Sequence, residues 1–595
     1  MSTWNISKHF DFDTQEKIDA AIALLQETTA AFVSEWKENT EYLSNPEVLA
    51  EALKQYEVWV RACGHGGGVG YYAWLKLQLN SENQENKALS AKLSEMSTNL
   101  YNQIQFFTLK IAKIEPSVQE TMLAHTALQE YKHFLARLFA QAKHQLSEKE
   151  EKILNLKSTS AYERWVQLVE QQLSAKSAPI MTEDGTEKET SFNEILGLRG
   201  SRNKAIRDSA AKQVHRLLAE YAPIAEAEIN AVFHDKKVDD TLRGFDRPDS
   251  DRHLNDDIET EVVDAMRKAV SGKFDVSARF YKLKAKLNGA PTMKYHERAV
   301  PYGNIEDNYS FEDAVVLVKG VFEKLDPSFA DIFQRFLDNG QIDVFPQKGK
   351  SGGAFCVYWT PEQPVFVLLN HAKTLGDVLT LAHEMGHAIN DEYIRDKQHA
   401  LHFETSTATA EVASTFMEDF VLAKLLETAD DEQRLAILMK RLDDDVAAIM
   451  RQVACYNFEE ALHKAVRGQG YVSKESIGKL FNEHMHAYMG DAVEQCDGAE
   501  NWWVYWSHIR RFFYVYSYAS GLLISKAMQN MVREDATNIE KVKTFLQTGV
   551  SKSPKETFAA MGIDIADAAF WQEGLKGIEQ TLVQAEELAK KLGKV

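Results

Sequence analysis

Apolar residues recur every three or four positions along most of the chain, which is the spacing of helices with one buried face. Residues 14–36, 45–62 and 86–114 show this pattern, and Thr14 stands where the first helix needs an N-cap. The same periodicity resumes near residue 202 and dominates to the end of the chain. The sequence therefore predicts a mainly α-helical protein.

Two stretches depart from helical spacing. Residues 174–192 are polar, with an Asp-Gly pair between two short strand-like runs, which is typical of a small hairpin or of a linker. Residues 341–370 contain two runs rich in β-branched and aromatic residues with a glycine-rich joint, so we expect a small sheet there. The polar stretch marks the predicted boundary between an N-terminal helical domain, residues 1–195, whose end carries the hairpin, and a catalytic domain, residues 196–595.

Composition narrows the class of protein. The chain has 595 residues, of which 44% are hydrophobic, enough for a large core. Its formal net charge of -20 argues against binding to nucleic acid or to an anionic membrane, because phosphate repels an acidic chain. We find neither a secretory signal nor a membrane-spanning run of about 18 apolar residues, so we expect a cytoplasmic protein. The four cysteines are widely spaced, which argues against disulfides and thiolate zinc sites.

The segment TLAHEMGHAIN, residues 380–390, carries the chemistry. His383 and His387 are four residues apart in a stretch of helical periodicity, so both imidazoles project from one face and can bind a single Zn²⁺ at about 2.0–2.1 Å. Glu384 lies about 100° further round the helix, where a general base can flank the open coordination position. The alternative is two ordinary helix histidines with a surface glutamate. It is less favoured because the segment is apolar and follows a strand-rich stretch.

A catalytic zinc ion needs a third protein ligand and one position left for water. Residues 402–420 contain the candidates His402, Glu404, Glu411, Glu418 and Asp419. We select Glu411, because it stands among small residues in a second predicted helix that can return toward the first. Glu418, seven residues on, lies on nearly the same face and can accept a hydrogen bond from a ligand imidazole. His402 is the competing ligand, although it falls in a predicted loop.

The segments LAHEMGHAIN and STATAEVASTFMED resemble the oligoendopeptidase F family of zinc peptidases, which is related to thimet oligopeptidase and neurolysin. The segments DGTEKETSFNEIL, SRNKAIRDSAAK, GKSGGAFCVYW, PVFVLLNH and HIRRFFYVYSYASG extend the resemblance over residues 180–525. It implies a two-lobed helical zincin-type metallopeptidase, with a small sheet beside the zinc helix and a deep channel that admits only short unfolded peptides. Carried over by position, His383, His387 and Glu411 bind one zinc ion per chain, and Glu384 is catalytic.

The aromatic segment 502–521 offers groups that hold substrate. A donor aimed at the oxyanion of the tetrahedral intermediate is worth about 3–4 kcal/mol. The family uses a histidine and tyrosines from this region, and we expect His508, Tyr514 and Tyr518 in catalysis and Tyr516 in substrate binding. The spacing departs by a residue or two from that of thimet oligopeptidase, so the individual tyrosine roles stay open.

The predicted sheet offers a second way to hold a peptide. Residues 365–369 are expected to form an exposed edge strand, to which an extended peptide can add as a further strand. Gly352 and Gly353 would allow the substrate backbone to approach closely.

These features predict a zinc-dependent endopeptidase that cleaves internal bonds of short oligopeptides with a zinc-activated water and Glu384 as general base. One alternative is a zinc carboxypeptidase of similar helical fold, in which Arg510 or Arg511 would hold the terminal carboxylate. Another is a peptide-binding protein with a structural zinc, which would need a fourth protein ligand that we do not find.

Overall fold

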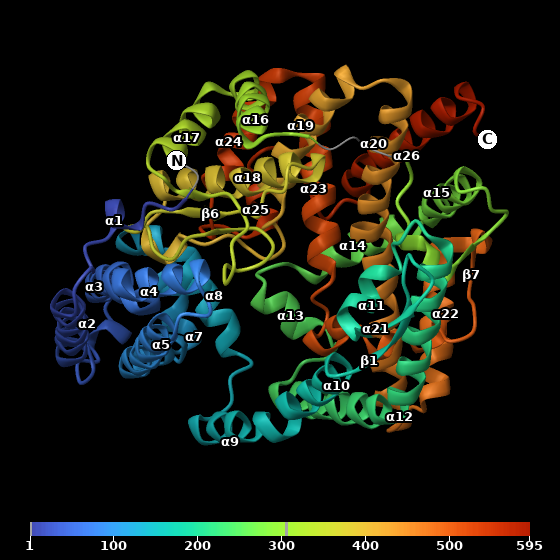
Figure 1. Cartoon of the computed structure of the whole chain (residues 1–595). Helices are drawn as coiled ribbons and strands as arrows, with labels where there is room; N and C mark the ends of the chain where they lie inside the picture. The colour runs from blue at the N-terminus through green and yellow to red at the C-terminus, as the bar shows by residue number, and fades with distance from the viewer. Residues whose placement is uncertain (1–2, 304–307) are drawn as a thin grey trace. The chain divides into compact units, whose positions relative to one another are not determined.

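The computed structural model describes residues 3–303 and 308–595, and the chain divides into two compact units (Figure 1). The first unit comprises Met1–Lys143, Glu306–Glu427 and Met528–Ile563, and the second comprises His144–Ile305, Thr428–Ala527 and Asp564–Val595. Each unit is mainly helical, which confirms the predicted fold class. The predicted domain boundary at residues 195 and 196 cuts the chain once, whereas each compact unit is assembled from three stretches. That boundary therefore stays a prediction.

The elements of the first unit come from all three of its stretches. Its helices are α1 (Ile6–His9), α2 (Gln15–Trp36), α3 (Pro46–Cys63), α4 (Gly67–Leu79), α5 (Gln84–Ile104), α6 (Phe106–Ala112), α7 (Pro116–Ala124), α8 (Lys132–Ala142), α16 (Phe311–Leu325), α17 (Pro327–Asp338), α18 (Leu375–Lys397), α19 (Val412–Thr428), α24 (Ile539–Leu546) and α25 (Pro554–Ala559). Its strands are β4 (Ile342–Asp343), β5 (Phe355–Val357) and β6 (Phe366–Leu368).

The second unit holds most of the remaining elements. Its helices are α9 (Glu148–Ser158), α10 (Arg164–Ser174), α11 (Phe192–Leu198), α12 (Lys204–Arg243), α13 (Ser250–Asn255), α14 (Thr260–Ser271), α15 (Phe274–Leu287), α20 (Asp431–Asp445), α21 (Arg451–Gln469), α22 (Lys474–Met489) and α26 (Ala568–Lys591). Its strands are β1 (Ser177–Met181), β2 (Glu187–Ser191), β3 (Met293–Lys294) and β7 (Val493–Glu494). Helix α23 (Tyr516–Glu534) begins in this unit and ends in the first.

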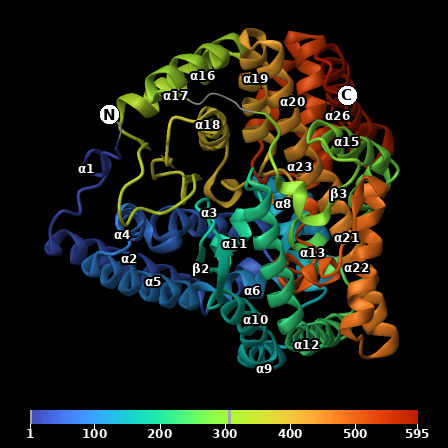
Figure 2. The same ribbon diagram turned by 45° about the vertical axis from the view of Figure 1, so that its right-hand side comes forward.

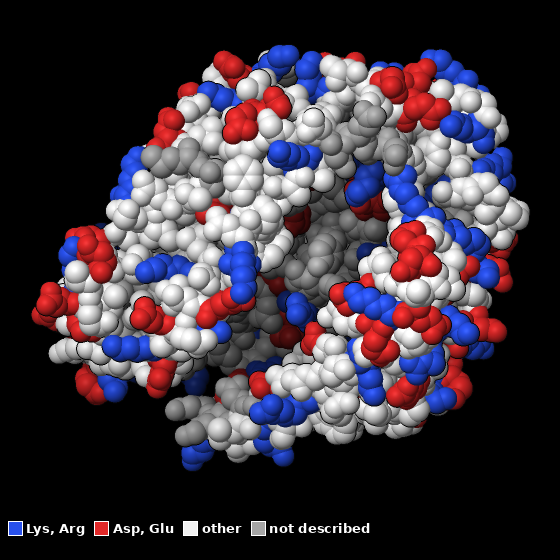
Figure 3. All heavy atoms as spheres, viewed as in Figure 1, with Lys and Arg blue, Asp and Glu red and all other residues white. Residues whose placement is uncertain are grey.

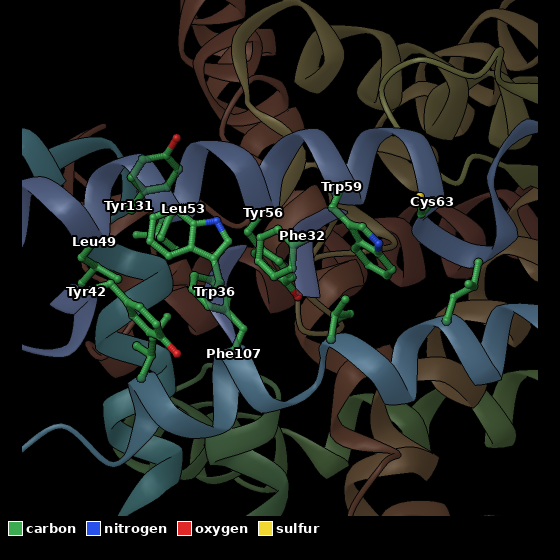
Figure 4. Packing of buried hydrophobic residues seen from close by; sticks show 14 of the residues in the cluster. Phe32, Trp36, Tyr42, Leu49, Leu53, Tyr56, Trp59, Cys63, Phe107 and Tyr131 are labelled. Carbon is green, nitrogen blue, oxygen red and sulfur yellow. The ribbon is translucent and has the colours of Figure 1, made fainter. Parts of the chain in front are cut away.

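The N-terminal helices form where capping and apolar spacing agree. The Thr14 hydroxyl accepts the Lys17 N–H at the start of α2, and Asn45 caps α3 ahead of Pro46. The buried faces of these helices meet in an aromatic core around Phe107 (Figure 4). Its ring centroid lies 5.3 Å from that of Phe32, with the two rings edge to face. This packing anchors the N-terminal helices of the first unit.

The predicted small sheet is present in the first unit, with the strand order β4-β6-β5. β6 is therefore the central strand, and its residues are buried, so the prediction of an exposed edge at residues 365–369 is wrong. The reason is β4, a two-residue strand too short to be seen in the sequence pattern. It pairs in parallel with β6, and the Asp343 carbonyl accepts the Leu369 N–H at 2.7 Å. The edge strand is β5, which pairs with β6 alone.

The second unit contains the predicted hairpin, in which β1 and β2 pair antiparallel on either side of the turn at Gly185. In this unit α21 and α22 run side by side (Figure 2). Arg510, only 3% exposed, donates to both carboxylate oxygens of Glu228 at 2.6 Å. This buried pair ties the segment after α22 to the long helix α12.

Acidic and basic side chains are interspersed over the face shown in Figure 3. Within the described residues, we find no helix whose length and apolar character would allow it to span a membrane.

Replacing Phe107 with alanine is expected to destabilise the first unit by about 3–5 kcal/mol, because the ring is fully buried among other aromatic rings. The matched control is Leu24→Ala on α2, where the side chain is 62% exposed and the expected change is below about 0.5 kcal/mol. Urea unfolding followed by circular dichroism measures both. Equal midpoints for the two variants would contradict this account of the core.

Candidate metal centre

Helix α18 carries the histidine pair and begins at a well-defined cap. The Thr374 hydroxyl accepts the Asp377 N–H, and the Asp377 carboxylate in turn accepts the Thr374 N–H. The helix that the periodicity around residues 380–390 predicts is confirmed. As the spacing predicts, His383 and His387 lie on one face, with ring centroids 5.0 Å apart.

Glu411 brings a carboxylate to the same point from the turn just before α19. Its Oε2 lies 3.3 Å from His383 Nε2 and 3.7 Å from His387 Nε2. Two ligand atoms that each lie about 2.0–2.1 Å from a tetrahedral zinc ion are about 3.3 Å apart, so this spacing suits one ion. Two imidazole nitrogens and a carboxylate oxygen are a donor set that zinc accepts. The helix expected around Glu411 starts one residue after it, and its first turn includes a bond from the Thr415 N–H to the Glu411 carbonyl.

Gly386 allows this convergence. A Cβ at this position would lie 2.6 Å from Ser414 Cα and 2.9 Å from the Ala413 carbonyl oxygen, closer than backbone atoms tolerate. The two helices therefore meet backbone to backbone between His383 and His387. Ser414 also donates to the Glu411 carboxylate at 3.1 Å, which helps to hold that side chain in place.

The hydrogen bond predicted for Glu418 is present, because its Oε2 lies 3.0 Å from His383 Nδ1. An imidazole that donates from Nδ1 to a carboxylate keeps its Nε2 lone pair free to bind a metal. Glu418 therefore orients His383 and selects the tautomer that a metal ligand needs.

The carboxylates around the histidines set their protonation when no metal is bound. Burial lowers the pKa of His383, but hydrogen bonds with Glu411 and Glu418 outweigh it and raise the pKa to about 10. Burial raises the pKa of Glu411, yet His383 and His387 lower it to about 2. Burial, followed by the charge of His383, lowers the pKa of His387 to about 4. A proton on His383 thus supplies the positive charge that Glu411 requires.

Glu384 lies on the wall of a cavity of about 410 Å³ within the first unit, beside both histidines. The side chain is 7% exposed, and burial raises its pKa to about 7, against the opposing charge of His383. A carboxylate with a pKa near neutrality can both accept and return a proton. Its environment suits the general base that the sequence predicts.

The same cavity contains residues that the sequence analysis missed. Asp391 lies four positions after His387, so helical spacing alone could have placed it on this face. Its Oδ2 lies 3.4 Å from the Cys356 sulfur in β5. Cys356 also hydrogen-bonds Glu384 through its backbone, so β5 helps to position the predicted base.

His402, the competing third ligand, does not join this cluster. It is buried, and its ring packs against that of His399 with centroids 4.1 Å apart.

In the second unit, Asp208, His296 and Glu297 also lie close enough together to hold an ion. Lys204 already pairs with both carboxylates of that group, so a cation is in place there.

The predicted catalytic residues His508, Tyr514 and Tyr518 of the second unit lie together. His508 Nε2 is 3.3 Å from the Tyr518 hydroxyl, and the Tyr514 and Tyr518 ring centroids are 5.6 Å apart. Burial, followed by the charge of Arg511, lowers the pKa of His508 and so favours its neutral form.

Tyr516 corrects one prediction. Its side chain is 0% exposed, and its hydroxyl donates to Asp256 at 2.9 Å, so it is a core residue rather than a substrate ligand.

Gly352 and Gly353 are exposed just before β5, and a Cβ on either would meet no atom within 4 Å. Their predicted role in binding substrate stays a prediction.

Two family models and several curated proteins match this chain. The model of the family described as Peptidase family M3 matches residues 197–577, and that of Oligopeptidase F matches residues 110–175. An oligoendopeptidase F homolog of Lactococcus lactis is 24% identical over 601 residues, covering 99% of this chain and 97% of that protein. The oligopeptidase PepF of Bacillus subtilis is 25% identical over 536 residues, covering 88% and 78%.

Solved structures share the fold. A crystal structure of a peptidase from Chlamydophila abortus superposes with a TM-score of 0.86 at 19% identity, covering 99% of this chain and 98% of that one. Oligoendopeptidase-F from Enterococcus faecium gives a TM-score of 0.71 at 18% identity, covering 97% and 99%. The mainly helical fold is therefore that of known peptidases.

Gly386→Ala is expected to lower both metal affinity and thermal stability, because the added methyl group would push α18 away from the Glu411 turn. Gly320→Ala on α16 is the matched control, since a Cβ there meets nothing within 4 Å and alanine favours a helix. Metal content after dialysis and the melting temperature are the measurements. An alanine variant at position 386 with unchanged metal retention would show that the close contact does not position Glu411.

Metal binding is expected to release about one proton near pH 7, because His383 is protonated in the metal-free chain and must lose that proton to act as a ligand. Affinity should rise with pH, by up to about tenfold per unit, while His383 still binds the proton. Titration calorimetry in buffers of different ionisation enthalpy counts the protons. Glu418→Gln removes one group that raises the pKa of His383, so it should reduce the release. Affinity that does not depend on pH would contradict this assignment.

Proposed function

This chain belongs to peptidase family M3, and we propose that it is a zinc-dependent endopeptidase that cleaves internal bonds of short, unfolded oligopeptides in the cytoplasm. Family membership makes it a metallo-oligopeptidase, and the relatives named oligoendopeptidase F support an internal cut. The observation that carries the choice of zinc is the convergence of His383, His387 and Glu411 on one point beside buried Glu384. Among the described residues, no fourth such ligand joins this group, which argues against a closed structural site.

The proposed mechanism assigns a proton transfer to Glu384. A zinc ion held by His383, His387 and Glu411 would supply a Lewis acid that acidifies water and polarises the peptide carbonyl. Glu384 takes the proton of the attacking water and later passes it to the leaving amine, so the carboxylate ends the cycle as it began. Glu418 holds His383 in the required orientation throughout.

His508, Tyr514 and Tyr518 are our candidates for donors to the oxyanion. The lowered pKa of His508 favours the neutral imidazole, which can donate one N–H, and the Tyr518 hydroxyl lies 3.3 Å from His508 Nε2. Tyr514 packs against Tyr518 and completes the group. Such donors favour the transition state because negative charge develops on the carbonyl oxygen only as water adds.

The edge strand β5 is our candidate for binding the peptide main chain. Phe355 and Cys356 of this strand line the cavity that contains Glu384. An extended peptide that pairs with the free edge of β5 would be held mainly through its backbone, which suits an enzyme that accepts varied sequences. Exposed Gly352 and Gly353, just before β5, leave room for such a chain.

A carboxypeptidase would need a free cation for the terminal carboxylate of its substrate, and one of the two candidate arginines is already paired. Arg510 is buried and bound to both oxygens of Glu228, so it has no free edge for a terminal carboxylate. Arg511 remains exposed. Mass spectrometry of a defined peptide mixture distinguishes the activities, because an endopeptidase makes chelator-sensitive internal cuts and a carboxypeptidase removes single C-terminal residues.

Glu384→Gln is expected to keep its zinc and lose about 10²- to 10⁴-fold in turnover, because the amide cannot accept the proton from water. Glu384 is not one of the three converging ligands, so metal content should match that of the unmodified protein. Hydrolysis of an internally quenched peptide and elemental analysis are the measurements. A variant that cleaves at near the original rate would remove Glu384 from the mechanism.

Glu411→Ala is expected to weaken zinc binding strongly, because one of three protein ligands is lost. Changes to outer-shell groups typically weaken metal binding by about 10- to 100-fold, and the loss here should be larger. Its activity should recover partly at high zinc concentration. Glu404→Ala is the matched control, since that carboxylate lies in the same region but outside the converging group. Unchanged zinc content in the Glu411 variant after dialysis would exclude it as a ligand.

A further inference from the structure

The second unit contains a cavity of about 420 Å³, all of whose lining residues belong to that unit. Cavities of this size hold small organic ligands. Its walls combine aromatic side chains, among them Phe481, Trp502 and Tyr505, with several arginines. His508, our candidate for a donor to the oxyanion, also lines it.

The arginines of this cavity outnumber the carboxylates. Arg510 is neutralised by Glu228, but Arg199, Arg298 and Arg451 form no ion pair with any residue in the described part of the chain. Glu170 is the one carboxylate among the described lining residues, and it is exposed and unpaired with these arginines. The cavity therefore carries an excess of positive charge although the whole chain is acidic.

Aromatic rings hold two of these guanidinium groups in place. Arg199 lies 4.4 Å from the centre of the Trp502 ring, and Arg298 lies 3.7 Å from that of Tyr295. Stacking fixes the plane of a guanidinium group but leaves the N–H groups along its edge free to bind an anion.

Most of these N–H groups have no protein acceptor. Arg199 donates to the Leu196 carbonyl at 2.8 Å, and Arg298 donates to the Tyr488 hydroxyl at 3.1 Å. The guanidinium group of Arg451 has no hydrogen-bond partner among the residues that the structure describes, although its backbone N–H donates to the Val446 carbonyl. The buried indole N–H of Trp502 is also without a partner there.

The two stacked arginines differ in their electrostatic surroundings. Burial, followed by the charge of Arg298, lowers the pKa of Arg199 to about 10. Burial lowers the pKa of Arg298 too, but Tyr295 and Tyr488 outweigh it and raise that pKa above its usual range. Partly buried cations are normally compensated by an anion or by several acceptors. A bound anion would reduce the repulsion that Arg298 exerts on Arg199.

We propose that this cavity binds the C-terminal carboxylate of a peptide whose last side chain is large and apolar, with Arg451 as a principal contact. The planar edge of a guanidinium group matches a carboxylate, and the aromatic walls suit the attached side chain. The ligand class rests on the proposed function, because peptides are the substrates of that reaction and each carries a terminal carboxylate. His508 in the same wall joins the cavity to the groups assigned to substrate.

The test compares N-acetyl-alanyl-alanyl-phenylalanine with its C-terminal amide. The full-length protein is used with zinc present and with Glu384→Gln to prevent cleavage, and affinities are measured by calorimetry. We expect the acid to bind at least about tenfold more tightly than the amide, as befits hydrogen bonds to a charged group. Arg451→Gln should abolish this preference, and Arg451→Lys should restore part of it.

Arg216→Gln on α12 is the matched control, because that arginine is exposed, pairs with Glu220 and lies outside the cavity. It should leave the preference unchanged. Arg451 makes no hydrogen bond that its replacement would break, so the Arg451→Gln variant should melt at the same temperature as its parent.

Three results would overturn the proposal. Equal affinity for acid and amide would show that the terminal carboxylate is not recognised. A preference that survives Arg451→Gln would place the carboxylate elsewhere, for example on the metal. Full competition by inorganic phosphate, with no discrimination between the peptides, would identify a site for a free anion.

Cleavage of an internally quenched peptide by the unmodified protein is measured separately. Cleavage without a preference for the acid refutes the cavity assignment alone. A preference for the acid without any cleavage refutes the endopeptidase assignment and supports the cavity as a carboxylate site.

Discussion

The metal centre depends on the backbone contact between α18 and α19 at Gly386. The two histidines need only helical spacing, but their third partner comes from another segment and must approach within hydrogen-bonding distance. Without a side chain at Gly386, Ser414 can lie against α18, and the turn that ends at Glu411 faces both imidazoles. Any larger residue would separate the helices and pull the carboxylate away. The glycine inside the His-Glu segment is therefore as necessary to the ligand set as the ligands themselves.

The charges at this centre are arranged around a cation. Glu411 and Glu418 both face His383, and without a metal a proton on His383 balances them. A divalent ion would displace that proton and balance the same two carboxylates with a larger positive charge. Asp391 is buried beside Cys356, and burial raises the pKa of its carboxyl group. Glu411 and Glu418 thus prepare the site for a cation.

Local patterns carried most of what could be predicted from the sequence. Helices, the hairpin at Gly185 and the histidine pair all follow from spacing within a few residues, and Glu411 followed from a second apolar helix placed within reach. Features that depend on distant partners could not be predicted. The burial of Tyr516 requires Asp256, 260 positions earlier in the chain. The central place of β6 requires β4, whose two residues give no periodicity. Compact units that each draw on three stretches likewise leave no single boundary in composition.

The positive charge of the cavity in the second unit could not be predicted from the sequence either. A net charge of -20 argues against broad anionic partners, because long-range repulsion depends on total charge. Binding in a cavity depends instead on charges within a few ångströms, where screening by solvent is weak. Arg199, Arg298 and Arg451 are far apart in the sequence and belong to no local motif, so their grouping appears only once the second unit has folded. An acidic protein can therefore repel nucleic acid as a whole and still bind a single carboxylate in one place.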